Sequence, residues 1–203
     1  MLRVFLFAAA LVGAGCAHRH AHHAEGGHDH GGHKCAHKCS GHEDKKKCAI
    51  CEASTTSTTD TAQAKVAPLG KGKVNGAISF FSSGPDLKVK VDLSGLQPNQ
   101  KQGFHIHEFG NCSGDGSTAG GHYNPGKQPH AGITEAQRHV GDLGNLMADA
   151  KGLVQTEITV PKTSLSQVLG RAVIVHAKED DLKSQPSGAA GDRVACGVIG
   201  LTQ

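Results

Sequence analysis

Two histidines alternate with apolar residues in the segment Gly103-Phe104-His105-Ile106-His107-Glu108. In a β-strand successive side chains point to opposite faces, so Phe104 and Ile106 would enter a core. His105 and His107 would then project together from the outer face, as in a metal clamp. The rest of residues 61–203 holds further metal-ligand types: His122, His130, His139, Asp142 and His176.

These residue types narrow the choice of metal. Six histidines fall within residues 61–203, which is hard to reconcile with scattered, unrelated surface histidines. Imidazoles with one carboxylate suit zinc, an all-imidazole set suits copper, and calcium or magnesium sites are built from oxygen ligands. The pattern therefore favours zinc, copper or both.

The elements that carry these residues show an apolar period of two. Leu87, Val89, Val91 and Leu93 alternate with polar residues, and residues 74–80 and 154–160 repeat the pattern. Such alternation is typical of half-buried strands, and the Gly, Pro and Asn clusters between them are typical of turns. The sequence predicts an all-β sandwich or barrel.

Two long stretches do not fit as strands. Gly110–Gly144 and Lys178–Arg193 are both rich in Gly and Asp, and the first is also rich in His. Loops of this length without secondary structure of their own are usually functional. We expect both to border the metal site.

Several motifs occur together in one order: GFHIHEFG at 103–110, GGHYNP at 120–125, RHVGDLGN at 138–145, Val175-His176, and GDRVACGVIGL at 191–201. Together they resemble the copper/zinc superoxide dismutase family, and the resemblance covers residues 61–203. It implies a Greek-key β-sandwich or flattened barrel with two long functional loops. It also implies an antioxidant oxidoreductase that converts two superoxide anions and two protons to oxygen and hydrogen peroxide.

The resemblance assigns roles residue by residue. Copper would be bound by His105, His107, His122 and His176. Zinc would be bound by His122, His130, His139 and Asp142. His122 is therefore shared between the metals and catalytic, and the catalytic Arg193 would hold the anionic substrate. Asp180 would link a copper histidine to a zinc histidine, and Cys112 and Cys196 would form a disulfide.

Some features of the domain stay open. The loop from His176 to Arg193 is shorter than in the eukaryotic members, so Lys178 and Lys183 are candidates for steering substrate but equally for solvated loop lysines. Val198–Leu201 would suit the homodimer contact of the eukaryotic branch, and equally a core strand. We expect a homodimer.

Residues 1–16 have the composition of a secretory signal peptide. A short positive start precedes the apolar run Val4–Val12, which is too short to span a bilayer, and Gly13-Ala14-Gly15 precede Cys16. Small residues before a cysteine resemble a lipoprotein signal with lipidation at Cys16, and ordinary cleavage near Ala17 is the alternative. We expect export to the periplasm or the cell envelope, where disulfides form.

Residues 17–60 form an arm rich in His and Cys, with almost no large apolar residue. Such a segment cannot bury enough apolar surface to offset ordering, so we expect disorder without metal. Its candidate copper or zinc ligands are His28, His30, His33, Cys35, His37, Cys39, His42, Cys48 and Cys51. Some bacterial members of the family resemble this chain in carrying a His-rich arm. Disulfides within a solvated spacer are the alternative.

The net charge of +3 argues against a nucleic-acid binder that works through a broad basic face. A copper or zinc chaperone, or a sequestering lipoprotein, on a dismutase-like domain is the competing function. Non-catalytic relatives typically lose copper ligands or the arginine. This chain keeps all seven ligands and Arg193, which favours the enzyme.

Overall fold

A computed structural model describes residues 61–202 of the chain. The predicted signal peptide, the His/Cys-rich arm and the boundary between them lie outside the described residues and stay predictions. The strands are β1 (Thr61–Pro68), β2 (Asn75–Ser83), β3 (Asp86–Ser94), β4 (Lys101–His107), β5 (Asp142–Met147), β6 (Val154–Val160), β7 (Ala172–His176), β8 (Arg193–Val198) and β9 (Gly200–Leu201). A 3₁₀ turn, η1 (Ser117–Ala119), and a short helix, α1 (Leu165–Val168), complete this part of the chain.

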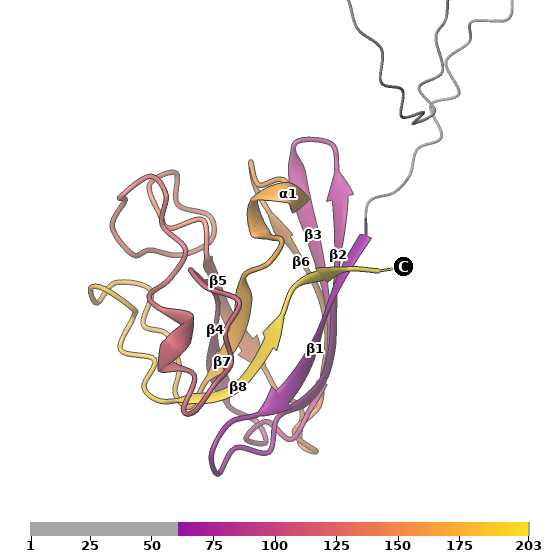
Figure 1. Cartoon of the computed structure of the whole chain (residues 1–203). Helices are drawn as coiled ribbons and strands as arrows, with labels where there is room; N and C mark the ends of the chain where they lie inside the picture. The colour runs from indigo at the N-terminus through magenta and orange to yellow at the C-terminus, as the bar shows by residue number, and fades with distance from the viewer. Residues whose placement is uncertain (1–60, 203) are drawn as a thin grey trace, which may run out of the picture. The chain divides into compact units, whose positions relative to one another are not determined.

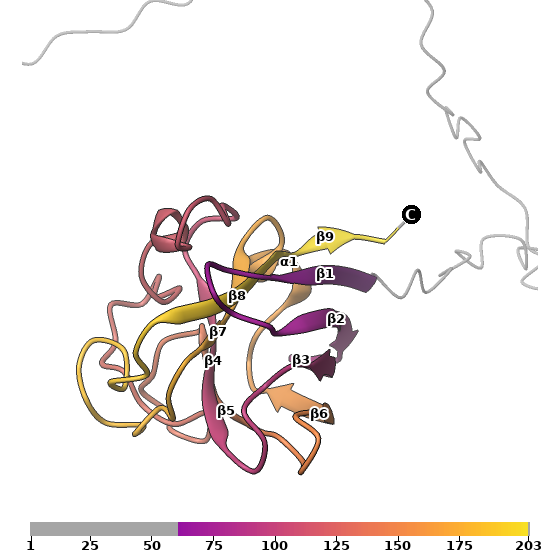
Figure 2. The ribbon, with the colours of Figure 1, turned by 90° about the horizontal axis from the view of Figure 1, so that it is seen from below.

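The strands form one antiparallel sheet that curls into a nearly closed barrel (Figures 1 and 2). Their order is β5-β4-β7-β8-β1-β2-β3-β6, with β9 paired to β1. The chain crosses over from β3 to β4 and from β6 to β7, which gives the Greek-key connections that the resemblance implied. The all-β prediction is confirmed.

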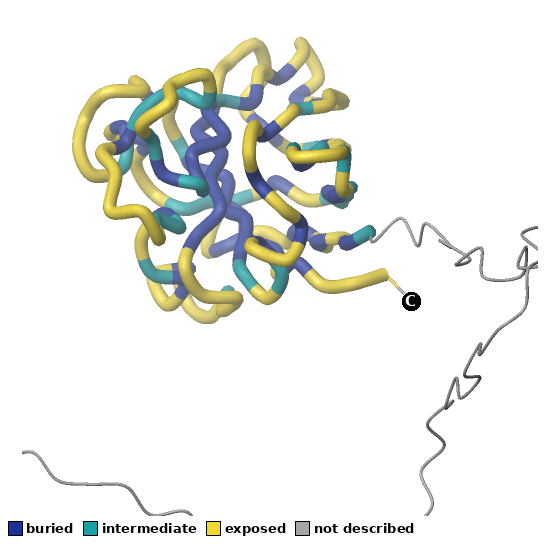
Figure 3. Tube along the Cα trace, turned by 90° about the horizontal axis from the view of Figure 1, so that it is seen from above, coloured by how far each residue is buried: buried dark blue, intermediate teal, exposed yellow. Residues whose placement is uncertain are grey.

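The predicted alternation sets which residues fill the barrel. On β3, Leu87, Val89, Val91 and Leu93 are buried, and Lys90 and Asp92 between them are exposed. β3 pairs in register with β2 and β6, so Ile78 lies opposite Val91 and Val160 opposite Leu87. Figure 3 shows a buried centre surrounded by loops whose residues are mostly exposed.

The strand β4 differs because it is buried on both faces. Phe104 and Ile106 join the core, as predicted, while His105 and His107 on the opposite face are also buried. Two long connections cover that outer face, one between β4 and β5 and one between β7 and β8. The loops expected at 110–144 and 178–193 are present, although β5 already begins at Asp142 and β8 at Arg193.

A disulfide fastens the first of these loops to the barrel. Cys112, beyond the end of β4, is bonded to Cys196 on β8, with a Cα–Cα distance of 5.7 Å. The predicted pairing is confirmed. Among the described residues, no helix has the length and apolar character needed to cross a membrane.

Candidate metal centre

Two groups of ligands lie side by side on the covered face of β4. The first is His105, His107, His122 and His176, and the second is His122, His130, His139 and Asp142. All seven residues are buried, and within each group the ligand atoms lie within 4.8 Å of one another. The structure therefore brings together every residue assigned to copper and zinc from the sequence, with His122 in both groups.

The backbone places each ligand through a different element. His105 and His107 lie on β4, and His176 ends β7, the neighbouring strand. His122 pairs with His107 through an isolated β-bridge, which folds the loop back over the strand. His130 and His139 follow on the same loop, and Asp142 opens β5 next to His105.

In the first group, hydrogen bonds determine which ring nitrogen of each histidine carries a proton and which is left with a lone pair. His107 Nδ1 donates to the carbonyl of Gly120 at 3.0 Å, and His176 Nδ1 donates to that of Gly191 at 3.1 Å. In each neutral ring this leaves Nε2 without a proton. The two Nε2 atoms nevertheless face each other at 3.3 Å, an arrangement that a cation between them would stabilise.

The other two ligands of this group point the same way. His105 Nε2 donates to Asp180 Oδ2 at 2.8 Å, so its Nδ1 carries the lone pair. Nδ1 of His105 and Nε2 of His122 are buried without a hydrogen-bond partner. Buried polar atoms are otherwise almost always paired, so these atoms fit a metal ligand role. A set of four imidazoles suits copper.

Burial holds these rings neutral. It lowers the pKa of His107 to about 2, that of His176 to about 3 and that of His122 to about 4, and it also lowers the pKa of His105. The hydrogen bonds that the rings donate to the Gly120 and Gly191 carbonyls, to Asp142 and to Asp180 raise these pKa values but by less than burial lowers them. A neutral imidazole is the form that binds metal.

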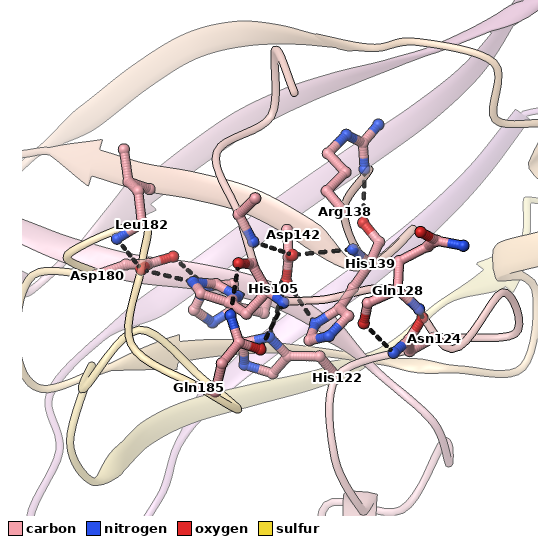
Figure 4. A network of polar contacts seen from close by, with 12 residues as sticks. His105, His122, Asn124, Gln128, Arg138, His139, Asp142, Asp180, Leu182 and Gln185 are labelled. Carbon is pink, nitrogen blue, oxygen red and sulfur yellow. Dashed lines mark hydrogen bonds and ion pairs between the residues drawn. The ribbon is translucent and has the colours of Figure 1, made fainter. Parts of the chain in front are cut away.

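The second group converges on one carboxylate (Figure 4). Nδ1 of His122, His130 and His139 lie 2.9, 3.0 and 3.0 Å from Oδ1 of Asp142. Burial would raise the pKa of Asp142, but the hydrogen bonds from the three rings hold it well below its usual range. Three imidazoles and one carboxylate form a donor set typical of zinc.

Asp180 connects the two groups. Its Oδ2 accepts from His105 and its Oδ1 accepts from His130 Nε2 at 2.9 Å. Although burial disfavours a charged ring, Asp142 and Asp180 together raise the pKa of His130 to about 9. Without a metal ion, a proton on His130 balances the two carboxylates, and a zinc ion would replace that proton.

Arg193 lies on β8 beside the first group. Its Nη2 donates to the carbonyl of Gly120 at 2.6 Å and its Nη1 donates to that of Gly116. His107 also donates to the Gly120 carbonyl, so one oxygen joins the guanidinium to a ligand of the copper group. Gly120 has φ +75°, and a Cβ there would come within 2.8 Å of the Phe109 ring, so the position requires glycine.

Several supporting residues were missed by the sequence reasoning. Asn145 donates to the carbonyl of Asp180 and accepts from its N–H, at 2.9 and 2.8 Å. Gln102 donates to the carbonyl of His176 at 2.6 Å. Neither has a spacing signal, because its partner lies far away in the chain. Asn145 did fall within a motif that carried the resemblance.

Arg171 was also missed. Its guanidinium carbon lies 3.4 Å from the centre of the Tyr123 ring, and Nη1 donates to the carbonyl of Glu108 at 2.7 Å. Glu108 follows His107 and Tyr123 follows His122. Arg171 therefore holds together the two segments that form the bridge between these histidines.

Comparisons with known proteins agree with the geometry. A family model described as copper/zinc superoxide dismutase matches residues 74–199. The copper-zinc superoxide dismutase of Yarrowia lipolytica is 43% identical over 145 residues, covering 66% of this chain and 94% of the relative. That of Schizosaccharomyces pombe is 43% identical over 143 residues, covering 65% and 93%. That of Paramecium bursaria Chlorella virus 1 is 37% identical over 158 residues, covering 73% and 84%.

Proposed function

We infer the roles of the site residues, the oligomeric state and the cellular location of this protein from one premise: the chain belongs to the copper/zinc superoxide dismutase family. It is an oxidoreductase that converts two superoxide anions and two protons to oxygen and hydrogen peroxide. The observation that carries this function is the pair of buried ligand groups that share His122. The chaperone alternative weakens accordingly, because both groups are complete.

Copper, bound by the four-histidine group, supplies the one-electron redox chemistry, which oxidises one superoxide and reduces the next. The zinc group fixes His122, whose Nδ1 faces Asp142 while Nε2 faces the copper group. We propose that His122 Nε2 holds a proton between the two half-reactions and delivers it to the reduced product. The support is that Nε2 of His122 is buried without a hydrogen-bond partner, so no protein group competes for a proton there.

Arg193 is proposed to bind the substrate anion. A guanidinium has five N–H donors, and two carbonyls of the covering loop accept hydrogen bonds from Nη1 and Nη2 of Arg193. The remaining donors can bind superoxide next to the copper group. The Gly116 and Gly120 carbonyls fix the orientation of the guanidinium, which lowers the cost of binding a small anion there.

Direct superoxide decay tests the function. The full chain, loaded with copper and zinc, is mixed rapidly with superoxide and the ultraviolet absorbance of superoxide is followed. We expect decay far faster than with the same concentration of chelated copper. A folded protein that holds both metals without accelerating decay would instead support metal storage or transfer.

We propose that the arm of residues 17–60 captures copper or zinc and passes it to the catalytic domain. The support is compositional: thiolates and imidazoles are clustered in a segment with few apolar residues. A chain lacking the arm should load more slowly than the full chain from a chelator-limited medium. Equal loading of the two proteins would refute delivery.

We propose that the chain is an exported bacterial member of the family, anchored by a lipid at Cys16. The support is the apolar run Val4–Val12 and the small residues before Cys16. Mass spectrometry of the mature N-terminus should show an acylated cysteine, and Cys16→Ala should release the protein from the membrane fraction. An unmodified N-terminus near Ala17 would indicate ordinary cleavage.

We propose a homodimer formed through the face that carries Phe109, Val198 and Leu201. These apolar side chains are 58%, 43% and 63% exposed in the single chain. A Cβ at Gly110 would touch Val198, so the segment after β4 lies against β8 at this face. Sedimentation should give a dimer for the parent and a monomer for Val198→Lys. A monomeric parent would exclude this arrangement.

A further inference from the structure

His130 is the zinc ligand with the weakest backbone support from its own loop. It lies within Gly120–Gly141, between η1 and β5, outside any strand, and is only 2% exposed. Among the residues that the structure describes, no backbone group forms a hydrogen bond with the N–H or C=O of His130. A buried peptide group needs a partner, because leaving it unpaired is costly.

The side chain of Gln185 supplies both partners (Figure 4). Gln185 Oε1 accepts from the N–H of His130 at 2.7 Å, and Nε2 donates to the carbonyl of His130 at 2.9 Å. The carboxamide thus pairs with His130 as a neighbouring strand would. Asn145 forms the same pair of bonds with the main chain of Asp180, which in turn holds the His130 ring.

The loop that carries Gln185 is closed by its own hydrogen bonds. Asp181 Oδ1 accepts from the N–H groups of Lys183 and Ser184, at 2.9 and 2.8 Å. The N–H of Gly188 donates to the Ser184 carbonyl at 2.7 Å, and that of Asp181 donates to the Gly188 carbonyl at 2.9 Å. Within this loop Gln185 Nε2 also donates to the Lys183 carbonyl at 3.1 Å, so the loop itself helps to orient the carboxamide.

The loop between β7 and β8 thus contacts both the ring and the main chain of His130. Asp180 binds the ring through Nε2, and Gln185, five residues later, binds the main chain. With the main chain and Nε2 of His130 both held, its other ring nitrogen, Nδ1, is directed at Oδ1 of Asp142 in the zinc group, 3.0 Å away. Partners that orient a ligand in this way raise metal affinity because the ligand loses less freedom on binding.

We propose that Gln185 is a positioning residue for zinc: its carboxamide holds the main chain of His130 and so sets the affinity of the zinc group. The proposal concerns metal binding rather than turnover. Its failure would therefore leave the dismutase function untouched.

The test compares Gln185→Met and Gln185→Ala with the parent in the full chain. Methionine keeps the length of the side chain but removes the two hydrogen bonds to His130 and the one to the Lys183 carbonyl, whereas alanine also removes the packing. Gln155→Ala is the matched control, because Gln155 is an exposed glutamine on β6 whose side chain bonds only Asp92. Cadmium NMR reports the site, since cadmium held by three imidazoles and a carboxylate resonates apart from cadmium held by arm thiolates.

Competition with a chelator then gives the affinity of the site in each protein. We expect about 10-fold weaker binding in both Gln185 variants and no change in Gln155→Ala. The metal-free melting temperature should fall in both Gln185 variants, because the buried peptide group of His130 loses its partners. Parental affinity in Gln185→Met would show that packing, not hydrogen bonding, matters and would overturn the proposal. A lower metal-free melting temperature with unchanged affinity would do the same, since it would mean a purely structural role.

Discussion

The imidazoles of the centre differ in which ring nitrogen donates a hydrogen bond to the protein and which is left to bind metal. Carbonyl groups fix His107 and His176 through Nδ1, while a carboxylate fixes His105 through Nε2. The free nitrogen is therefore Nε2 in the first two rings and Nδ1 in the third. His122 alone faces both ligand groups.

Replacing His122 should affect both metals at once. His122→Ala removes one ligand from each group, so we expect activity to fall by at least about 10-fold and the copper spectrum to lose its dependence on zinc. Copper spectroscopy with and without zinc measures this directly. Full turnover with an unchanged copper spectrum would disprove the shared role.

Arg193 offers a second test at this scale. Arg193→Ala should lower the second-order rate with superoxide by about 10-fold, because it removes the positive charge next to the copper group. Arg193→Lys keeps the charge but lacks the planar fork, and should lie between the two. The rates are compared at several ionic strengths, and equal rates for all three proteins would argue against substrate binding by Arg193.

At the scale of the elements, specific contacts join the long loops to the strands of the barrel. The disulfide between Cys112 and Cys196 joins the loop after β4 to β8, the strand that also carries Arg193. Arg171, just before β7, joins the segments that follow His107 and His122. These two links help to fix the loops over the strands that carry the copper ligands.

Breaking the disulfide should loosen the loop that presents Gly116 and Gly120 to Arg193. The bond closes a sequence separation of 84 residues, and removing such a bond destabilises a domain by about 2–5 kcal/mol. We expect Cys112→Ser with Cys196→Ser to lower the melting temperature and to reduce activity further than unfolding explains. Thermal unfolding and activity of the folded fraction, measured together, would show whether both change.

Removing Arg171 should weaken copper binding more than zinc binding. Arg171→Ala loses the stacking on Tyr123 and the hydrogen bond to Glu108, and both stabilise the bridge between His107 and His122. A loss of about 10-fold in copper affinity is expected, by chelator competition. If copper is retained as in the parent, the bridge does not depend on Arg171.

Across the described part of the chain, residues 61–202, the buried histidines of the two ligand groups differ in the direction of their pKa shifts. In the metal-free protein, His107, His122 and His176 have folded-state pKa values below the ordinary 6.5. His130 has one above it, at about 9. The two kinds of shift act at opposite ends of the pH range.

Metal-free stability should therefore be greatest near neutral pH. As the pH falls below 6.5, the unfolded chain takes up protons that the three buried rings cannot, so stability decreases. As the pH rises from 6.5 through about 9, His130 loses its proton and the stability that it gave. Melting temperatures across pH test this, and metal loading should raise them while flattening the alkaline decline.

Much of this architecture follows from local pattern in the sequence. Alternating Leu87, Val89, Val91 and Leu93 had to form a strand with one buried face, because period two is the strand repeat. The pair His105 and His107 had to share a face of its strand for the same reason. The ligand sets and the cysteine pair followed from the family resemblance, which depends on local motifs.

What only the tertiary structure decided are the contacts between distant residues. Which ring nitrogen of His105 is free depends on Asp180, which lies 75 residues away, and the main chain of His130 depends on Gln185, 55 residues away. Arg171 stacks on Tyr123 across two different connections. No local period encodes such pairs, because they meet only after the Greek-key crossovers bring β4, β7 and β8 together.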